Sequence, residues 1–203
     1  MTAILKVDTI QDTSGNNIIN ESSDTITIGA SGDTIALAGT TVTGITQGIT
    51  EADMWRLTAD TNAGVGATTV ISTNWERVDT DGYEKIGTGL TESSGVFSFP
   101  STGIYLIIAT GNVSINSGIT NQVFELNTTL DNSSYSLAAV NGTGTGGVTI
   151  RGNMGLQFIF DVTNISTHKF RFSTGGMGSA NSWIRGNSAL NETCFSVTRL
   201  GDT

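Results

Sequence analysis

Between residues 96 and 200 the sequence repeats one pattern: a short run of alternating apolar and polar residues that ends near Gly, Asn or Ser. The longest such run covers 104–115, and others cover 123–129, 148–151, 156–162, 169–173 and 194–200. Alternation with a period of two places the apolar side chains on one face of a strand, whereas a helix would show a period of 3.6 residues. Many short strands at this spacing predict a β-sandwich or a β-barrel.

The composition also favours strands over helices. The chain has 26 Gly, one Pro and only 13% charged residues, whereas a typical soluble domain has about 25%. The many Thr, Val and Ile residues suit a pleated surface because their branched side chains are stiff at χ1. We therefore expect an all-β protein with almost no helix.

The charge balance bears on the partners of the chain. Its formal net charge is −9, with nine Lys and Arg residues in total, and a phosphate backbone requires a basic footprint. No apolar run approaches the ~20 residues that span a bilayer, and residues 1–6 lack the apolar core of a signal peptide. We therefore expect no nucleic-acid binding, no membrane insertion, and assembly in a cytoplasm.

The first 45 residues differ from the rest. The tripeptide Asp-Thr-Ile begins at positions 8, 24 and 33, and the last two copies open short alternating units that close with Gly. From about residue 49 onward, aromatic residues and longer apolar runs appear instead. We therefore expect an N-terminal stalk over 1–45 and a folded head over 46–203.

Each stalk repeat offers one narrow apolar edge, which includes Ile26, Ile28, Ile35 and Leu37. So little apolar area does not offset the conformational entropy of one chain. Three chains wound around a common axis would each bury this edge against two neighbours. We therefore predict a trimeric, intertwined β stalk with these four residues at its interface; the alternative is a disordered Ser/Thr/Gly linker.

Residues 96–107 read Val-Phe-Ser-Phe-Pro-Ser-Thr-Gly-Ile-Tyr-Leu-Ile. They resemble the C1q/TNF-like jelly roll, whose members carry Phe-x-x-Pro-x-x-Gly-x-Tyr at this point, where Pro ends a strand and Gly permits a tight turn. The resemblance covers roughly residues 50–203. It implies a jelly-roll β-sandwich head that forms a homotrimer, with Tyr105 and Ile107 on the strand that lines the subunit interface.

Residues 5–17 resemble the opening of short fibre and appendage proteins of tailed phages, particularly those of marine bacteria. Such proteins attach to the virion through their N-terminal end and present a C-terminal head outward. The resemblance implies a virion structural protein that contacts other virion proteins through Leu5, Val7 and Ile10. It leaves tail and capsid attachment open, and a capsid decoration protein without a receptor is the main alternative.

The sequence shows little that points to catalysis. His168 is the only histidine, and no Gly-x-Ser-x-Gly elbow accompanies it, so a Ser-His-Asp arrangement has no evident nucleophile. We expect no enzyme, no catalytic residue and no cofactor; a tailspike-type polysaccharide depolymerase is the remote alternative. Asp79, Asp81 and Glu84 surround a Gly turn and form a weak Ca²⁺ candidate, because they lack the spacing of an EF-hand loop.

Aromatic residues give the remaining hypotheses. Trp183 and Arg185 lie in a long Gly/Ser/Asn-rich segment, and since both residue types are enriched at binding hot spots, they are candidate contacts to a host cell-surface glycan or protein. Packing at the subunit interface is the alternative for this segment. We expect Trp55 and Trp75 to lie in the core or at the junction with the stalk. Cys194, the only cysteine, is expected to be a small buried side chain.

Overall fold

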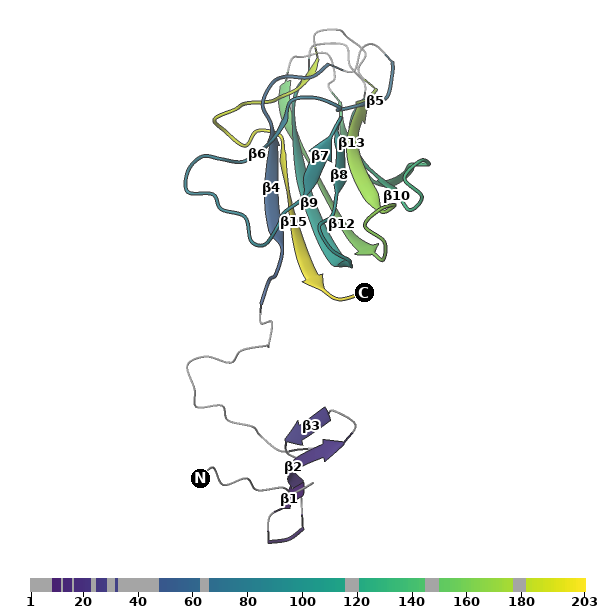
Figure 1. Ribbon diagram of the computed structural model, residues 1–203. Helices are drawn as coiled ribbons and strands as arrows, with labels where there is room; N and C mark the ends of the chain where they lie inside the picture. Colours follow the sequence, from purple (N-terminus) through teal and green to yellow (C-terminus); the bar gives the residue numbers. More distant parts are fainter. Residues whose placement is uncertain are drawn as a thin grey trace. The chain divides into compact units, whose positions relative to one another are not determined.

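The computed structural model describes residues 9–11, 13–15, 17–22, 25–28, 32, 48–62, 66–115, 121–144, 150–176 and 182–203, and only the backbone of 17–22 and 25–27. The chain divides into two units, Met1–Thr46 and Gln47–Thr203 (Figure 1). All regular structure in the described ranges is β-strand. None of these residues belongs to a helix long and apolar enough to cross a membrane.

The N-terminal unit contains a small antiparallel sheet in the order β1-β2-β3, formed by Thr9–Gln11, Asn17–Ser22 and Thr25–Ile28. β1 and β3 coincide with the first two Asp-Thr-Ile repeats. The side chains of Ile10 and Ile28 are 40% and 50% exposed in the single chain. Ile26 lies in β3, whereas Leu5, Val7, Ile35 and Leu37 lie outside the described residues. Winding of three chains in this unit stays a prediction.

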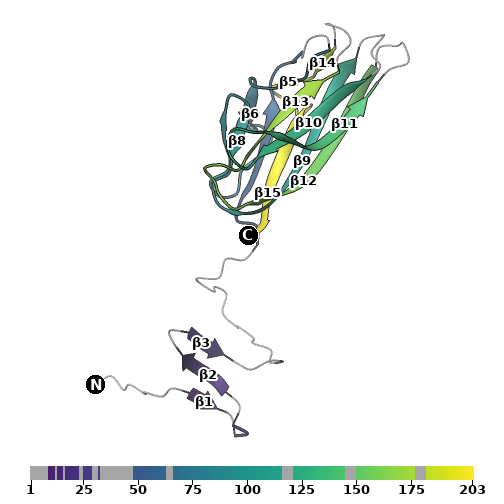
Figure 2. The same cartoon turned by 90° about the vertical axis from the view of Figure 1, so that its right-hand side faces the viewer.

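The second unit, the head, is a sandwich of two antiparallel sheets (Figures 1 and 2). One sheet has the strand order β12-β9-β15-β4-β6, with β14 beside β9, and the other has the order β11-β10-β13-β8-β7, with β5 beside β13. The strands are β4 (Ala52–Leu57), β5 (Thr69–Val70), β6 (Trp75–Arg77), β7 (Thr91–Ser93), β8 (Val96–Ser98), β9 (Gly103–Ile115), β10 (Gln122–Thr129), β11 (Ser136–Thr143), β12 (Ile150–Val162), β13 (Lys169–Gly175), β14 (Trp183–Ile184) and β15 (Cys194–Gly201).

Aromatic side chains fill the space between the two sheets. The ring of Phe97 is fully buried and packs edge-on against the rings of Trp55 and Phe195, with centroid distances of 5.4 and 4.7 Å. Trp75 contacts the same ring at 5.6 Å. Such pairs add to the free energy of burying apolar area. The expectation that Trp55 and Trp75 belong to the core is confirmed, since they are 7% and 9% exposed.

β12 differs from the sequence expectation. Two short strands over 148–151 and 156–162 were predicted, but one strand runs from Ile150 to Val162. It pairs with β9 along its whole length, from Ile150 opposite Ile115 to Val162 opposite Gly103. The ladder therefore continues through two glycines that a local pattern treats as strand ends.

Candidate functional site

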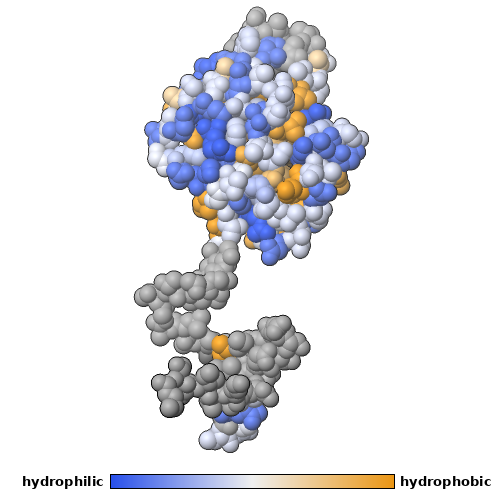
Figure 3. Space-filling model, in the orientation of Figure 1, coloured by the Kyte–Doolittle hydropathy of each residue, from blue (hydrophilic) through white to orange (hydrophobic). Residues whose placement is uncertain are grey.

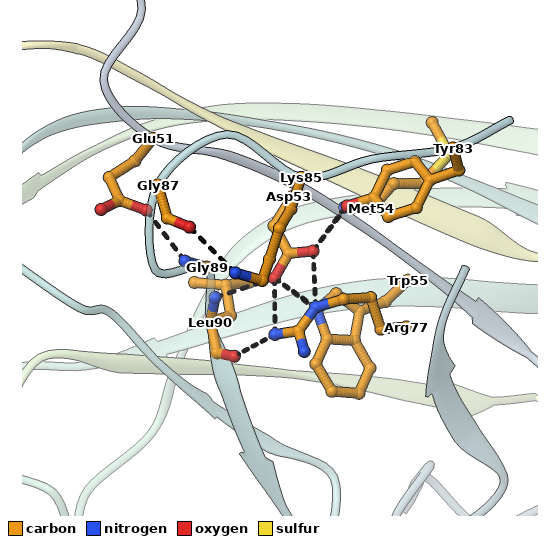
Figure 4. Close-up of polar contacts among 10 residues, drawn as sticks. All are labelled: Glu51, Asp53, Met54, Trp55, Arg77, Tyr83, Lys85, Gly87, Gly89 and Leu90. Carbon is orange, nitrogen blue, oxygen red and sulfur yellow. Dashed lines mark hydrogen bonds and ion pairs between the residues drawn. The ribbon is translucent and has the colours of Figure 1, made fainter. Parts of the chain in front are cut away.

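A buried carboxylate on β4 organises a cluster of polar contacts in the head (Figure 4). Asp53 is 4% exposed, and one of its oxygens, Oδ1, accepts hydrogen bonds from the Tyr83 hydroxyl at 2.7 Å and Arg77 Nε at 3.0 Å. The other, Oδ2, accepts from Trp55 Nε1 at 3.0 Å, Arg77 Nη2 at 3.0 Å and the Leu90 amide at 2.8 Å. We call these five residues the Asp53 lock.

The charges of the Asp53 lock stabilise one another. Burial alone would raise the pKa of Asp53, but the hydrogen bonds from Arg77, Tyr83, Trp55 and the Leu90 amide outweigh it and lower this pKa below its usual value. Burial, together with the hydrogen bond to Asp53, raises the pKa of Tyr83. The guanidinium of Arg77 also packs over the Trp55 ring, 4.8 Å from its centroid, and such a contact adds cation–π attraction.

The Asp53 lock ties the segment 78–90 to β4. Gly89 has a φ of +76°, and a Cβ there would lie 2.7 Å from Asp53 Oδ2, so only glycine lets the segment approach this closely. Glu51 accepts hydrogen bonds from the Thr88 and Gly89 amides at 3.1 and 2.9 Å. Because both Asp53 oxygens are occupied by protein donors, this arrangement positions a segment and offers no lone pair to a metal or substrate.

Acidification is expected to weaken the Asp53 lock. A carboxylate with a lowered folded-state pKa contributes stability that is fully present above its unfolded pKa of about 3.9 and is lost as the pH falls through the folded value. The difference in Tm between the wild type and Asp53→Asn should therefore be constant from about pH 7 to 5 and shrink below about pH 4. Calorimetry across this range measures it, and a difference that stays constant down to pH 2 would contradict this assignment.

The acidic residues predicted as a weak Ca²⁺ site do not converge. Asp79 Oδ1 is bound by Arg56 Nη2 at 2.7 Å, and Asp81 and Glu84 are exposed. Arg56 itself is 1% exposed and also pairs with Glu76 at 2.7 Å. In the parts of the chain that the structure describes, no group of three or more His, Cys, Asp and Glu residues could hold a metal ion. Asp79 thus balances a buried arginine.

The central part of the outer face of the sheet that contains β9 forms a second feature, which we call the uncharged face; Arg56 of β4 and Asp161 of β12 border it. Strand register and alternating burial put its members side by side across four strands. None carries a charge, and Ile108 and Ile159 are 47% and 60% exposed. Its members are Gly155, Gln157 and Ile159 of β12, Leu106, Ile108 and Thr110 of β9, Cys194, Ser196 and Thr198 of β15, and Ala52 and Met54 of β4.

Two predicted interface residues lie on the opposite side of β9. Tyr105 and Ile107 are both 1% exposed, inside the sandwich of a single chain, and the Tyr105 hydroxyl bonds to the Ser101 carbonyl at 3.0 Å. The prediction that they line a subunit interface is therefore wrong. Successive side chains of β9 point to opposite faces of the sheet, so Leu106 and Ile108 face outward instead. Cys194, predicted to be buried, is only half-buried on the uncharged face, and burial raises the pKa of its thiol.

The predicted host contacts lie at one end of the head. Trp183 pairs with Ser114, near the last residue of β9. Ala52, the first residue of β4, pairs with Thr198, which in turn pairs with Leu106 near the first residue of β9. Trp183 and Ala52 therefore lie at opposite ends of this sheet. The Trp183 side chain is 36% exposed. Arg185 is held by ion pairs to Asp60 and Glu192.

Apolar side chains reach the surface of the head in several separate patches between polar areas (Figure 3). The sequence pattern identified neither the uncharged face nor the Asp53 lock. One signal for the lock existed: Asp53 occupies the same strand face as Trp55 and Leu57, where an isolated charge requires partners.

Comparisons with known proteins bear on the fold. No protein-family model matches the chain, and no curated protein matches its sequence. Murine APRIL is 11% identical with a TM-score of 0.54, over 74% of this chain and 98% of that chain. Eiger TNF from S. frugiperda is 10% identical with a TM-score of 0.52, over 75% and 93%. PRD1 vertex protein P5 is 20% identical over 76% and 100%, with a TM-score of 0.48. The likeness to APRIL and Eiger confirms a TNF-like jelly-roll head.

Proposed function

We propose that the chain is a structural virion protein, a homotrimeric tail or capsid fibre whose head is displayed for binding to a host surface. The uncharged face is the observation that carries the assembly part of this proposal. The virion location rests on the resemblance of residues 5–17 to phage fibre proteins. Leu5, Val7 and Ile10 are the proposed contacts to other virion proteins.

The charge of the chain makes the uncharged face informative. With a net charge of −9, two copies repel each other wherever acidic residues meet. On this face eleven neighbouring positions carry no charge, and aliphatic side chains such as Ile108 and Ile159 stand in solvent. An exposed apolar area of this kind is typical of an interaction surface, and here a second copy can approach without like charges.

Gly155 supports the same surface. It lies within β12, and a Cβ at this position would meet nothing within 4 Å. A glycine inside a strand lowers stability by roughly 0.5–1 kcal/mol relative to alanine, so the single chain gains nothing from it. Glycine within a strand often marks a place where another backbone comes close. We propose that a neighbouring subunit approaches the head here.

Three copies would close the assembly. The number three follows from the C1q/TNF-like resemblance. When each subunit makes the same contact with the next and the ring closes, no surface is left open to which a further subunit could bind. Trp183 and Arg185 lie at the end of the head opposite to Ala52, so we propose these residues as host contacts. Several weak contacts on one particle then act together by avidity.

Light scattering on the purified full-length chain tests the assembly. We expect a mass near three times the 21.1 kDa of one chain, and a monomer would overturn the proposal. Added protein should also compete with particles for adsorption to host cells, and antibody labelling should find it on fibres. Labelling confined to the capsid lattice without competition would instead favour a decoration protein.

A further inference from the structure

A groove of about 400 Å³ opens between β12 and the loop that joins β10 to β11. The residues that line it are Phe158 and Phe160, which we call the aromatic floor, together with Leu130 and with the polar residues Thr128, Asp131, Ser134 and Ser136, which we call the rim. We infer that this groove binds a neutral saccharide. The inference rests on the proposed display of the head at a host surface and names the ligand class that it would recognise there.

The aromatic floor is fixed by its neighbours. Phe160 is 5% exposed, stacks on the His168 ring at 5.8 Å and meets the Phe99 ring edge-on at 5.6 Å. Phe158 lies 6.0 Å from Phe160 and is half-buried. The exposed part of Phe158, backed by the buried Phe160, offers apolar area to the flat C–H face of a sugar ring with little loss of side-chain entropy.

Asp131 is a fixed acceptor at the rim. Its Oδ1 accepts hydrogen bonds from the Ser134 amide at 2.7 Å, the Ser133 amide at 2.8 Å and the Thr129 hydroxyl at 2.9 Å. None of these three hydrogen bonds involves Oδ2. Hydrogen bonds from the Ser134 and Ser133 amides and from the Thr129 and Ser134 side chains hold the pKa of this carboxyl well below its usual range. One carboxylate oxygen is therefore oriented by the loop and left open to a ligand hydroxyl.

The chemistry of the lining selects the ligand class. Three hydroxyls and one free carboxylate oxygen can donate to and accept from several sugar hydroxyls, as polar groups around an apolar pocket commonly do. No Lys or Arg lines the groove, so an anionic sugar would meet an uncompensated carboxylate and be repelled. A neutral saccharide satisfies both the aromatic floor and the charged rim.

Saturation-transfer NMR on the full-length chain tests this inference, with maltose, lactose and cellobiose as neutral probes and sialyllactose as the anionic probe. We expect at least one neutral disaccharide to bind with a Kd of about 1–10 mM, in the range of a single weak contact. Asp131→Asn should weaken that binding about tenfold. This variant keeps an amide oxygen for the Ser133 and Ser134 amides but replaces the free acceptor with a donor.

Asp161→Asn is the matched control. Asp161 is exposed on β12 and does not line the groove, so this substitution removes the same charge outside the groove. Binding should be unchanged in this variant. The inference is overturned if no neutral probe binds at about 50 mM, if Asp131→Asn binds as well as the wild type, or if sialyllactose binds equally well. It is also overturned if Asp131→Asn dissociates the assembly, since the groove would then be a contact between copies. If the protein is a trimer that competes for adsorption but binds none of the probes, the saccharide inference is contradicted and the proposed function is not.

Discussion

Asp53→Ala is expected to lower the free energy of unfolding of the head by about 3 kcal/mol, a large share of the roughly 5–15 kcal/mol that holds a domain folded. The substitution leaves the Arg77 guanidinium, the Trp55 Nε1–H and the Leu90 amide without their acceptor. We place the loss at the lower end for a broken buried pair because the Arg77 side chain is 32% exposed and water can reach it. Urea unfolding followed by tryptophan fluorescence measures it.

Asp161→Ala provides the comparison for this loss, since it removes an exposed carboxylate and should change stability by less than about 0.5 kcal/mol. Asp53→Asn should fall between the two, because its amide oxygen still accepts some of the hydrogen bonds. A loss below about 1 kcal/mol for Asp53→Ala would show that the segment 78–90 is held by other contacts.

Ile108→Asp is expected to convert the proposed trimer into a folded monomer of 21.1 kDa. Ile108 is 47% exposed in the single chain, so an aspartate there remains hydrated in the monomer and should change its stability by less than about 1 kcal/mol. In the assembly, three carboxylates would be buried near one another without partners, which costs several kcal/mol each. Light scattering and circular dichroism measure mass and fold together.

Ile165→Asp is the control for this dissociation. Ile165 is 44% exposed on the connection between β12 and β13, outside the four strands that form the uncharged face, and its variant should keep the trimeric mass. The thiol of Cys194 gives a second measurement of dissociation, because a subunit that has left the assembly should react faster with a thiol reagent at this residue. An Ile108→Asp protein that keeps three chain masses would show that the uncharged face is not the contact.

Local pattern predicted much of the head but not the extent of every strand. β9, β10, β13 and β15 were each expected within two residues of their bounds, because alternation over a buried face is a direct consequence of strand geometry. β12 was divided in two because Gly152 and Gly155 interrupt the local pattern. Its length is set by pairing with β9, whose paired residues lie 35 to 59 positions earlier in the sequence, and propensity does not report such distant partners.

The functional residues were harder to predict, for a related reason. Alternation shows that β9 has two faces, but both are apolar around residues 104–108, so the pattern cannot say which face the second sheet covers. Tyr105 and Ile107 were placed at the interface through the C1q/TNF-like resemblance, and the structure buries both inside the sandwich. The partners of Asp53 include Tyr83 and Leu90, which come from a segment without periodicity, and only the folded chain brings them to β4.

The position of β4 has a mechanical consequence. A pull transmitted through the N-terminal segment enters the head at Ala52, the first residue of β4, which is hydrogen-bonded to β15 on one side and β6 on the other. Hydrogen bonds between antiparallel strands lie perpendicular to the strands. Tension along β4 therefore loads its hydrogen bonds to β15 and β6 in shear, so that all of them resist together and do not break one after another. Asp53 is the second residue of this strand, and its hydrogen bonds to Arg77, Tyr83 and Leu90 hold the strand in place next to the point where the force enters.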